Sequence, residues 1–212
     1  MKDIAIYGAG GFGRETALLI QQINKLDKQW NLLGFFDDAL PKGSRVDGLV
    51  ILGGMKEALQ HTGAIAIAVA DPSIREKIAG NLLKNTKLEF PSLIHLHAQM
   101  GSEVFNKIGR GCIITAGVIM TTHITLGDFC IINLSATVGH DVILGAFTTI
   151  MPGCSISGNV NIGQGVLLGT GARMLQNINI GDHATIGAGA VVTKHCPPNE
   201  TWVGVPASKK IP

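Results

Sequence analysis

One histidine in this sequence stands next to an acid, in a position to move a proton. His140 is followed directly by Asp141 in the stretch NLSATVGHDVILG. Histidine exchanges a proton near neutral pH, and an acidic or carbonyl partner on its other ring nitrogen fixes the tautomer. Such a pair can take a proton from an amine or hydroxyl group as that group attacks an acyl donor. Because an aspartate side chain is short, the sequence leaves open whether Asp141 reaches the imidazole.

A glycine-rich stretch near the N-terminus has the spacing of an anion-binding loop. Gly8, Gly10 and Gly13 fit the pattern G-x-G-x-x-G between an apolar strand and a helix, where backbone N–H groups and the helix N-terminus can face a phosphate. Asp37, at the end of the next apolar segment, is placed for a hydrogen bond to a ribose or a base. The alternative is a tight turn that binds no ligand.

The elements that carry this loop are expected to form a small α/β unit. The apolar patterns predict strands at residues 3–7, 31–36 and 64–69, and helices at 14–24 and 72–83, with the glycines forming a turn before the first helix. About 90 residues are enough for one βαβαβ half, and hence for one nucleotide. A dinucleotide such as NAD is therefore not expected.

The elements that carry His140 follow from a six-residue repeat. From residue 108, fourteen hexads keep one register; the first position is always Ile, Leu, Val or Met, the fifth is a small or β-branched residue or Cys, and the second is Gly in eight hexads. This period predicts a parallel β-helix of eighteen-residue coils, stacked about 4.8 Å apart. We expect an α/β domain over residues 1–91 and the β-helix over 92–212. A purely structural β-helix is the alternative.

The composition bears on the compartment and the partners expected for this chain. The chain has 212 residues, a formal net charge of +2 and 46% hydrophobic residues. It contains no apolar run long enough to span a bilayer, no signal peptide at its start and no basic block. We therefore expect a cytoplasmic protein without a nucleic-acid or membrane partner.

The whole chain resembles the hexapeptide-repeat sugar-nucleotide acetyltransferases of bacteria, which include UDP-4-amino-sugar N-acetyltransferases and sialic-acid O-acetyltransferases. The hexads, the stretch around His140 and the closing VGVPA carry the resemblance. It implies a Rossmann-like α/β half domain followed by an all-β left-handed parallel β-helix, with acetyl-coenzyme A as co-substrate and no metal. It also implies a homotrimer with active sites between subunits, which would cover apolar residues such as Phe147 and Met151.

The resemblance also implies roles for individual residues. His140 corresponds to the general base of the family, and Asp141 stands where its acidic partner is usually Glu. Gly158, one coil beyond His140, matches the residue whose backbone N–H binds the oxyanion, and Asn133 matches one that positions the acceptor from a neighbouring subunit. Thr149 stands where some relatives carry a second histidine.

The binding residues are implied in the same way. Those that match the nucleotide-sugar loops of the family are Gly10, Gly11, Asp37, Asp38 and Asp71. Gly8 and Gly13 join them as substrate-binding candidates through the G-x-G-x-x-G pattern. Those expected along the path of coenzyme A are Gly158, Gly187, Ala188 and Gly189, with Lys209 or Lys210 near its phosphates.

The remaining histidines and the cysteines are given structural interpretations. His123 and His183 occupy outward fourth positions of their hexads, and their spacing from His140 does not match that of the zinc carbonic anhydrase built on the same repeat. The hexad cysteines occupy the small fifth position, which favours packing over an acyl-enzyme nucleophile; they are Cys112, Cys130 and Cys154.

Together these features predict N-acetylation of a nucleotide-linked amino sugar by direct transfer, in the synthesis of a surface glycan or glycoprotein. O-acetylation of sialic acid or a related sugar is the first alternative, because the same His140 would deprotonate a hydroxyl group. A non-enzymatic sugar-nucleotide-binding scaffold is the second.

Overall fold

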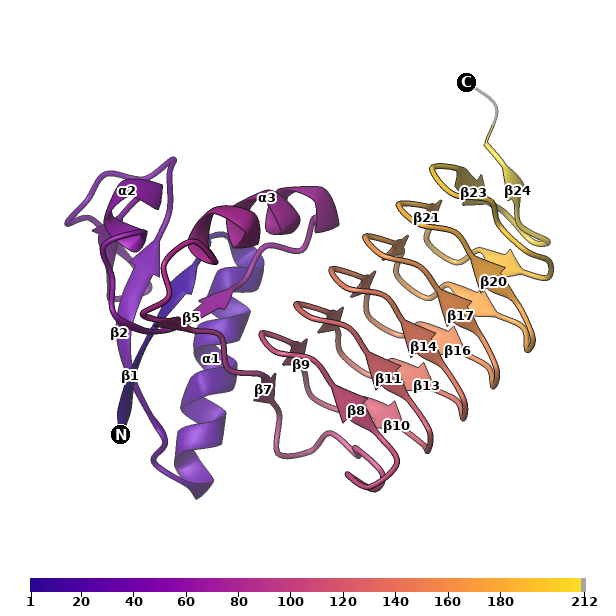
Figure 1. Cartoon of the computed structure of the whole chain (residues 1–212), viewed down its shortest axis with the longest axis horizontal. Coiled ribbons are helices and arrows are strands. Elements are labelled where there is room, and N and C mark those ends of the chain that lie inside the picture. The colour runs from indigo at the N-terminus through magenta and orange to yellow at the C-terminus, as the bar shows by residue number, and fades with distance from the viewer. Residues whose placement is uncertain (211–212) are drawn as a thin grey trace. The chain divides into compact units, whose positions relative to one another are not determined.

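The computed structural model describes residues 1–210. These divide into two compact units, Met1–His95 and the chain from Leu96 onward (Figure 1). Each unit has its own buried core. None of the described helices is long and apolar enough to cross a membrane.

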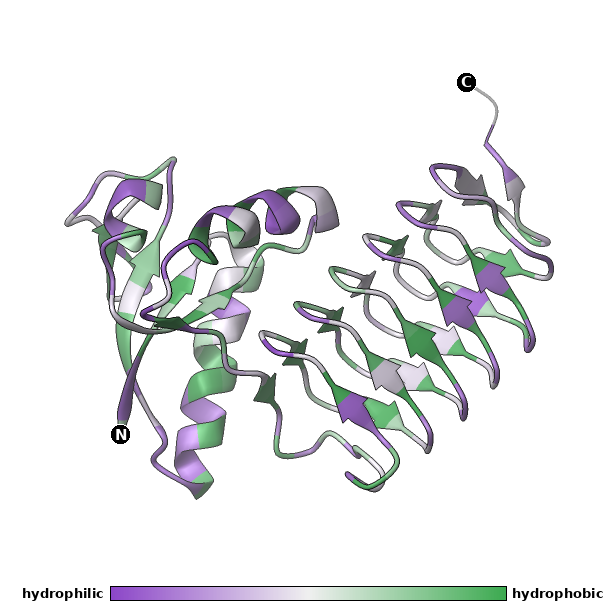
Figure 2. Cartoon of the chain, in the orientation of Figure 1, coloured by the Kyte–Doolittle hydropathy of each residue, from purple (hydrophilic) through white to green (hydrophobic). Residues whose placement is uncertain are grey.

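The first unit is a six-stranded sheet in the order β3-β4-β2-β1-β5-β6, with α1, α2 and α3 packed around it. All its strand pairs are parallel except the β3–β4 hairpin. The central strand β1 is apolar and fully buried at Ile4, Ala5 and Ile6, whereas α1 alternates between hydrophilic and hydrophobic residues (Figure 2). The elements are β1 (Lys2–Tyr7), α1 (Gly11–Leu26), β2 (Trp30–Phe36), β3 (Arg45–Val46), β4 (Leu49–Gly53), α2 (Met55–Ala58), β5 (Gly63–Ile67), α3 (Pro72–Leu82), β6 (Leu88–Glu89) and β7 (Leu93–Ile94).

Helix α1 begins earlier than the sequence predicts. The expected start was residue 14, but the helix starts at Gly11 with Gly10 as its N-cap. Gly13 therefore lies in the first turn of α1, and a Cβ atom there would overlap the carbonyl oxygen of Gly8. Gly8 itself has φ 102°, which favours glycine. The glycines thus allow the helix to start close against the end of β1.

The second unit is a left-handed parallel β-helix. The hexads predict the parallel β-helix, and the family resemblance implies its hand. Its three faces are β8-β11-β14-β17-β20, β10-β13-β16-β19-β22, and β9-β12-β15-β18-β21 continued by β23 and β24. Paired residues are eighteen apart, as Ile131 is from Ile113 and from Thr149. The strands are β8 (Lys107–Ile108), β9 (Ile113–Ile114), β10 (Ile119–Met120), β11 (Thr125–Leu126), β12 (Ile131–Ile132), β13 (Thr137–Val138), β14 (Ile143–Leu144), β15 (Thr149–Ile150), β16 (Ser155–Ile156), β17 (Asn161–Ile162), β18 (Leu167–Leu168), β19 (Arg173–Met174), β20 (Asn179–Ile180), β21 (Thr185–Ile186), β22 (Val191–Val192), β23 (Thr201–Val203) and β24 (Ser208–Lys209).

At the corners of the β-helix, the second and fourth positions of the hexad meet different structural requirements. The fourth position has a positive φ in all fourteen hexads, in six as glycine and in eight as another residue. Eight of the fourteen second positions are glycine, for a different reason: a Cβ atom on Gly127 or Gly145, for example, would overlap the backbone of the next coil. Close stacking of the coils thus explains the frequent second-position glycines.

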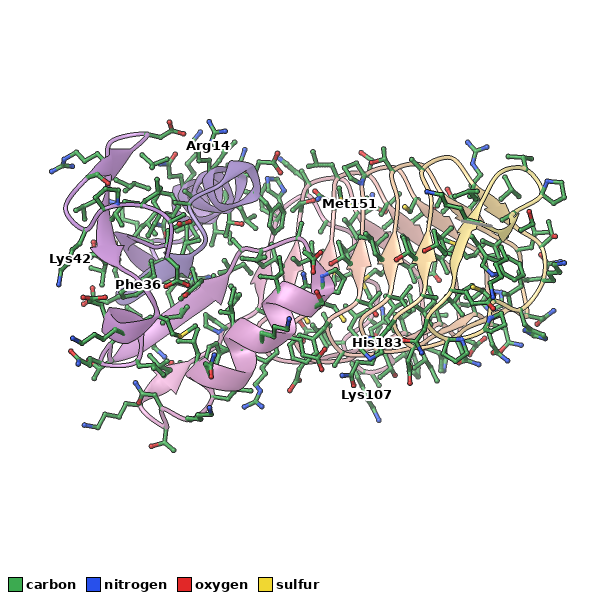
Figure 3. The ribbon with its side chains drawn as sticks, turned by 90° about the horizontal axis from the view of Figure 1, so that it is seen from above. Arg14, Phe36, Lys42, Lys107, Met151 and His183 are labelled. Carbon is green, nitrogen blue, oxygen red and sulfur yellow. The ribbon has the colours of Figure 1, made fainter. Side chains whose placement is uncertain are left out.

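The apolar residues at the surface of the β-helix are not the ones expected. Phe147 is half-buried because its ring stacks on Phe129, with ring centroids 5.4 Å apart and planes 4° from parallel. Met151 (labelled in Figure 3) is also half-buried. The large apolar side chains exposed on the hexads are Ile119, Leu134, Ile143 and Leu175.

Candidate active site

The structure joins His140 and Asp141 directly. Nδ1 of His140 lies 2.8 Å from Oδ2 of Asp141, and the two side chains are 65% and 58% exposed. Asp141 is a fourth-position residue with φ 59°, and its backbone N–H donates to the carbonyl of Thr122 in the preceding coil at 3.1 Å. A carboxylate at Nδ1 favours the proton on that nitrogen, which leaves Nε2 as the free acceptor. The aspartate is therefore long enough to orient the imidazole.

The imidazole of His140 lies against Gly158, one coil further along. A Cβ atom on Gly158 would overlap Cε1 and Nε2 of the ring. The next residue, Asn159, donates its N–H to the His140 carbonyl at 2.8 Å, whereas the N–H of Gly158 has no hydrogen-bond acceptor among residues 1–210. An unused backbone donor therefore lies beside the nitrogen that can take a proton.

The other predicted residues of the β-helix lie along a different corner. Asn133 and Gly187 are 54 residues apart, which is three coils, so they occupy the same corner together with Ala188 and Gly189. Asn133 is 4% exposed, and its Oδ1 accepts from the N–H of Leu134 at 3.0 Å. Within the described part of the chain, no contact joins Asn133 to His140. One chain alone thus carries two halves of the predicted site on two corners.

Thr149, which stands where some relatives carry a second histidine, is fully buried in β15.

One of the two C-terminal lysines, Lys209, is paired with a carboxylate. The ammonium group of Lys209 lies 2.7 Å from Oε1 of Glu200, whose other oxygen accepts from the indole N–H of Trp202 at 2.8 Å. These two donors hold the pKa of Glu200 below its usual range. The ammonium group of Lys194 lies 5.4 Å from the ring centroid of Trp202.

The hexad cysteines are buried free thiols. Each donates a hydrogen bond to the carbonyl of the glycine fifteen residues ahead, at 3.1 to 3.3 Å; the pairs are Cys112 with Gly127, Cys130 with Gly145, and Cys154 with Gly169. Burial also raises the pKa of the Cys154 thiol. These thiols therefore pack and bond within the coils, away from solvent.

The predicted carboxylates of the first unit organise the loop at the end of β1. Asp37 accepts hydrogen bonds from the N–H groups of Ala9 and of Ala39, both at 2.9 Å. Asp38 accepts from the Tyr7 hydroxyl at 2.6 Å and from the N–H of Met55 at 2.7 Å. Burial and the bond to Asp38 raise the pKa of Tyr7, so its phenol remains a donor.

The glycines at the start of α1 leave this end of the helix open. Gly10 and Gly11 are exposed, and a Cβ atom on either would meet no other group within 4 Å. Helix α1 has no side-chain cap and no acidic residue in its first turn. Its first N–H groups are therefore available to an anion.

Asp71 and Arg75 hold the loop after β5. Asp71 caps α3, since its Oδ1 accepts from the N–H of Ile74 at 3.0 Å and from the Ser73 hydroxyl at 2.8 Å. The hydrogen bond from Ile74 lowers the pKa of Asp71 more than its other contacts do. Arg75 is buried, and one of its nitrogens donates to the carbonyl of Val69 at 2.6 Å. Arg75 was not predicted from the sequence; its only signal there is a charged residue on the buried side of the predicted helix.

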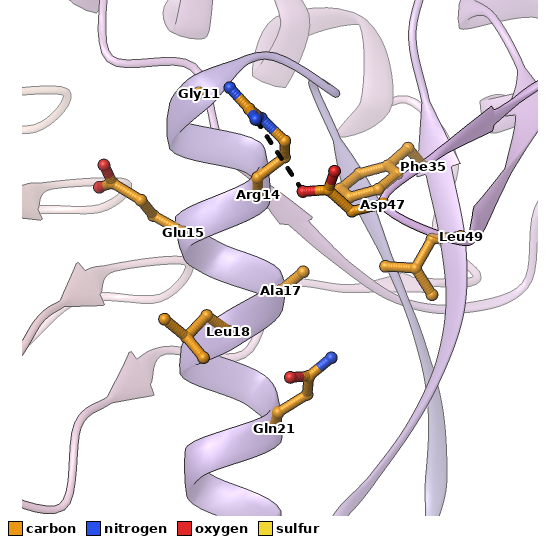
Figure 4. Close-up of a pocket in the computed structure, with 9 residues that line it drawn as sticks. All are labelled: Gly11, Arg14, Glu15, Ala17, Leu18, Gln21, Phe35, Asp47 and Leu49. Carbon is orange, nitrogen blue, oxygen red and sulfur yellow. Dashed lines mark ion pairs between the residues drawn. The ribbon is translucent and has the colours of Figure 1, made fainter.

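A pocket of about 490 Å³ lies beside α1 (Figure 4). Of the predicted residues it contains only Gly11, and none from the β-helix. Arg14 and Asp47 form an ion pair across it at 4.0 Å. The residues that line it are Gly11, Arg14, Glu15, Ala17, Leu18, Gln21, Phe35, Asp47 and Leu49.

The two fourth-position histidines point outward. His123 and His183 are exposed, and His183 lies at the outer edge of the coils in Figure 3. The His123 ring stacks on Phe105, with ring centroids 4.7 Å apart. Across residues 1–210, no three His, Cys, Asp or Glu side chains are grouped to hold a metal ion.

Two protein families match parts of the chain. Residues 3–82 match the PglD N-terminal domain, and residues 159–194 match the bacterial transferase hexapeptide, a family of six repeats. Among curated proteins, the chain is 33% identical over 137 residues to the GDP-perosamine N-acetyltransferase of Escherichia coli O157:H7. That match covers 61% of this chain and 58% of the relative.

Solved structures match over nearly the full length. The acetyltransferase domain of PglB from Neisseria gonorrhoeae FA1090 is 32% identical with a TM-score of 0.89, covering 99% of this chain and 100% of that domain. The same domain has been solved in complex with acetyl coenzyme A, and matches with a TM-score of 0.88. PerB from Caulobacter crescentus, solved with CoA and GDP-perosamine, is 28% identical with a TM-score of 0.87, covering 99% of this chain and 97% of that one.

Proposed function

The chain belongs to the hexapeptide-repeat sugar-nucleotide acetyltransferases, and from that premise we propose that it transfers an acetyl group from acetyl-coenzyme A to the amine of a nucleotide-linked sugar. The observation that carries the proposal is the His140–Asp141 pair beside the unused N–H of Gly158. Of the relatives named above, one is a GDP-perosamine N-acetyltransferase, one is solved with acetyl coenzyme A, and one is solved with CoA and GDP-perosamine. We propose a role in the synthesis of a surface glycan or glycoprotein.

The proposed reaction is a direct transfer without an acyl-enzyme. The amine nitrogen attacks the thioester carbonyl while Nε2 of His140 takes one of its protons, and the carboxylate of Asp141 stabilises the imidazolium. The N–H of Gly158 donates to the oxyanion of the tetrahedral intermediate. When the intermediate collapses, the C–S bond breaks, and the leaving coenzyme A thiolate is protonated by Nε2 of His140. The products are an N-acetyl sugar and the free thiol.

We propose that the complete site forms between subunits of a homotrimer. His140 and Gly158 lie along one corner of the β-helix, whereas Asn133 and Gly187 to Gly189 lie along another. If the first corner of one chain faces the second corner of its neighbour, both halves meet without any change within a chain. In this arrangement coenzyme A runs past Gly158 on one chain and past Gly187, Ala188 and Gly189 on the other.

We propose that the first unit binds the nucleotide part of the acceptor. Gly8, Gly10, Gly11 and Gly13 bring the open N-terminus of α1 to the end of β1, where its N–H groups can donate to a diphosphate. Asp37, Asp38 and Asp71 hold the surrounding loops through the hydrogen bonds described above, and the remaining lone pairs of the two neighbouring carboxylates can accept from a ribose or a base. We propose that the reaction takes place in the cytoplasm.

The acceptor can be identified by mixing the protein with acetyl-coenzyme A and a panel of UDP-, dTDP-, GDP- and CMP-linked sugars. The panel contains amino sugars, including GDP-perosamine, and matched hydroxyl sugars, and free thiol release is followed. We expect release with an amino sugar and an amide in the product. Turnover of hydroxyl sugars alone would replace the proposal by O-acetylation, and no turnover with any sugar would favour a binding scaffold.

A further inference from the structure

The turn before the first complete hexad exposes two apolar side chains. Val104 is 80% exposed and Phe105 is 50% exposed. The Phe105 ring stacks on the imidazole of His123, with ring centroids 4.7 Å apart and planes 25° from parallel. Nδ1 of His123 lies 3.0 Å from the hydroxyl oxygen of Thr122. The turn thus presents an aromatic surface that is backed by a second ring.

A buried asparagine fixes this turn to the β-helix. Asn106 is 7% exposed, and its Nδ2 donates to the carbonyl of Met100 at 2.6 Å and of Thr121 at 3.1 Å. Its Oδ1 accepts from the N–H of Ile124 at 2.9 Å. The turn is therefore held by hydrogen bonds rather than by burial of Phe105, which leaves the ring available.

This aromatic surface lies along the corner that carries the general base. Phe105, His123 and Asp141 follow one another at intervals of eighteen residues, and the N–H of Asp141 donates to the coil that contains His123. At about 4.8 Å per coil, Phe105 is roughly 10 Å from Asp141 along the axis. Gly158 lies one coil away on the opposite side. Along this corner, His140 thus lies between Gly158 in the following coil and the rings of His123 and Phe105 in the preceding coils.

We propose that Phe105, backed by His123 and flanked by Val104, binds the apolar face of the acceptor sugar and so selects the acceptor. The inference rests on the proposed function, in which the thioester occupies the Gly158 side of His140. The amine must then reach Nε2 with its sugar ring on the other side, over Thr122 and toward Phe105. The C–H face of a hexose, or a methyl group on it, packs well against an aromatic ring.

The test compares two substitutions within the same turn. Phe105→Ala removes the aromatic surface, whereas Glu103→Ala changes an exposed neighbour and leaves the ring in place. Phe105→Tyr and His123→Phe keep the stacked pair and serve as rescue variants. For each, kcat and both KM values are measured with the amino-sugar nucleotide that the wild type acetylates. A second acceptor that carries a hydroxymethyl group in place of a methyl group, or the reverse, measures selectivity.

We expect Phe105→Ala to raise the KM for the acceptor about tenfold and to lose most of the preference for the methyl-bearing acceptor. The KM for acetyl-coenzyme A should stay within about twofold of the wild type, and Glu103→Ala, Phe105→Tyr and His123→Phe should behave like the wild type.

Unchanged acceptor kinetics in Phe105→Ala would overturn the inference. An equal rise in the KM for acetyl-coenzyme A would also overturn it, and so would a change in the mass of the assembly by light scattering, because the surface would then be a contact between chains. If the wild type itself transfers no acetyl group, the proposed function fails instead.

Discussion

His140 depends on a single side chain for its orientation. The 2.8 Å contact between its Nδ1 and Oδ2 of Asp141 is the only side-chain contact that the structure records for its ring nitrogens within residues 1–210. The adjacency of the two residues predicted this pairing, but the reach of the short aspartate could not be judged from the sequence. In the structure Asp141 adopts a positive φ of 59°, which the one-letter code does not show.

Replacing Asp141 by Asn tests this orientation. The substitution keeps the shape but removes the charge that stabilises the imidazolium, so we expect kcat to fall about a hundredfold with little change in either KM. Steady-state kinetics measures the effect. Asp128→Asn is the control, because Asp128 is a corner aspartate that pairs with Arg110 rather than with a histidine. Equal rates for Asp141→Asn and the wild type would show that the carboxylate has no part in proton transfer.

A second prediction concerns the buried thiol of Cys196. Burial, and to a lesser extent the charge of Glu200, raises its pKa from 9.0 to about 11. The unfolded chain then loses the thiol proton at lower pH than the folded protein does. The stability due to the buried neutral thiol is complete below about pH 9 and is lost as the pH rises toward 11.

Urea unfolding of the wild type and of Cys196→Ala at pH 8 and pH 10.5 measures this loss. Other groups titrate equally in both proteins, so the stability advantage of the wild type should shrink at the higher pH. A constant difference between the two proteins would contradict the raised pKa.

Among the elements, the hexads were predictable and the corners were not. The apolar first position is repeated in every hexad, and the structure pairs residues eighteen apart along all three faces. The positive φ at the fourth position was hidden because only six of the fourteen residues are glycine; Phe129 and His183 give no such signal. The second-position glycines are explained by the close approach of the next coil, and that contact joins residues far apart in the sequence.

In the first unit, long elements were predicted better than short ones. The strands and helices expected from the apolar pattern match β1, β2, β5 and α3 within about two residues, as such boundaries usually do. The β3–β4 hairpin, α2 and β6 were missed because segments of two to five residues carry too little periodicity. The hydrogen bonds from Tyr7 to Asp38 and from Arg75 to Val69 depend on the fold and could not be read from the sequence.

The turn before β8 should contribute measurably to stability through Asn106. Removing its amide in Asn106→Ala takes a hydrogen-bond partner from the carbonyls of Met100 and Thr121 and from the N–H of the buried Ile124, so we expect the free energy of unfolding to fall by about 2 to 3 kcal/mol. Denaturant unfolding gives this value. Asn161→Ala is the control, because Asn161 is exposed and, within residues 1–210, its side chain bonds only that of Asn179; its loss should cost less than about 0.5 kcal/mol. Similar losses for both variants would contradict the anchoring role of Asn106.

At the scale of the whole molecule, the proposed trimer makes the activity depend on assembly, because the proposed site residues lie on two corners of the β-helix. We expect His140→Ala to be inactive through loss of the base. Ala188→Trp should be inactive because its bulk fills the path of coenzyme A along the other corner, where Ala188 is exposed. If each site takes one corner from each of two neighbours, mixed trimers contain some sites with both corners intact.

Refolding the two inactive variants together at equal concentrations measures this sharing. Random mixing should restore about one quarter of the wild-type activity, since each site needs an intact corner from both chains. The separately refolded variants are the controls. No recovery from the mixture, with trimers confirmed by light scattering, would place the whole site within one chain.

The proposed role of His140 as the general base is tested most directly by the rate of acetyl transfer by His140→Ala. With the amino-sugar nucleotide that the wild type acetylates, we predict a kcat at least about a hundredfold lower, while calorimetry shows coenzyme A binding unchanged and light scattering shows the same assembly. A kcat close to that of the wild type would contradict this role, because the proton of the attacking amine would then be removed by some group other than His140.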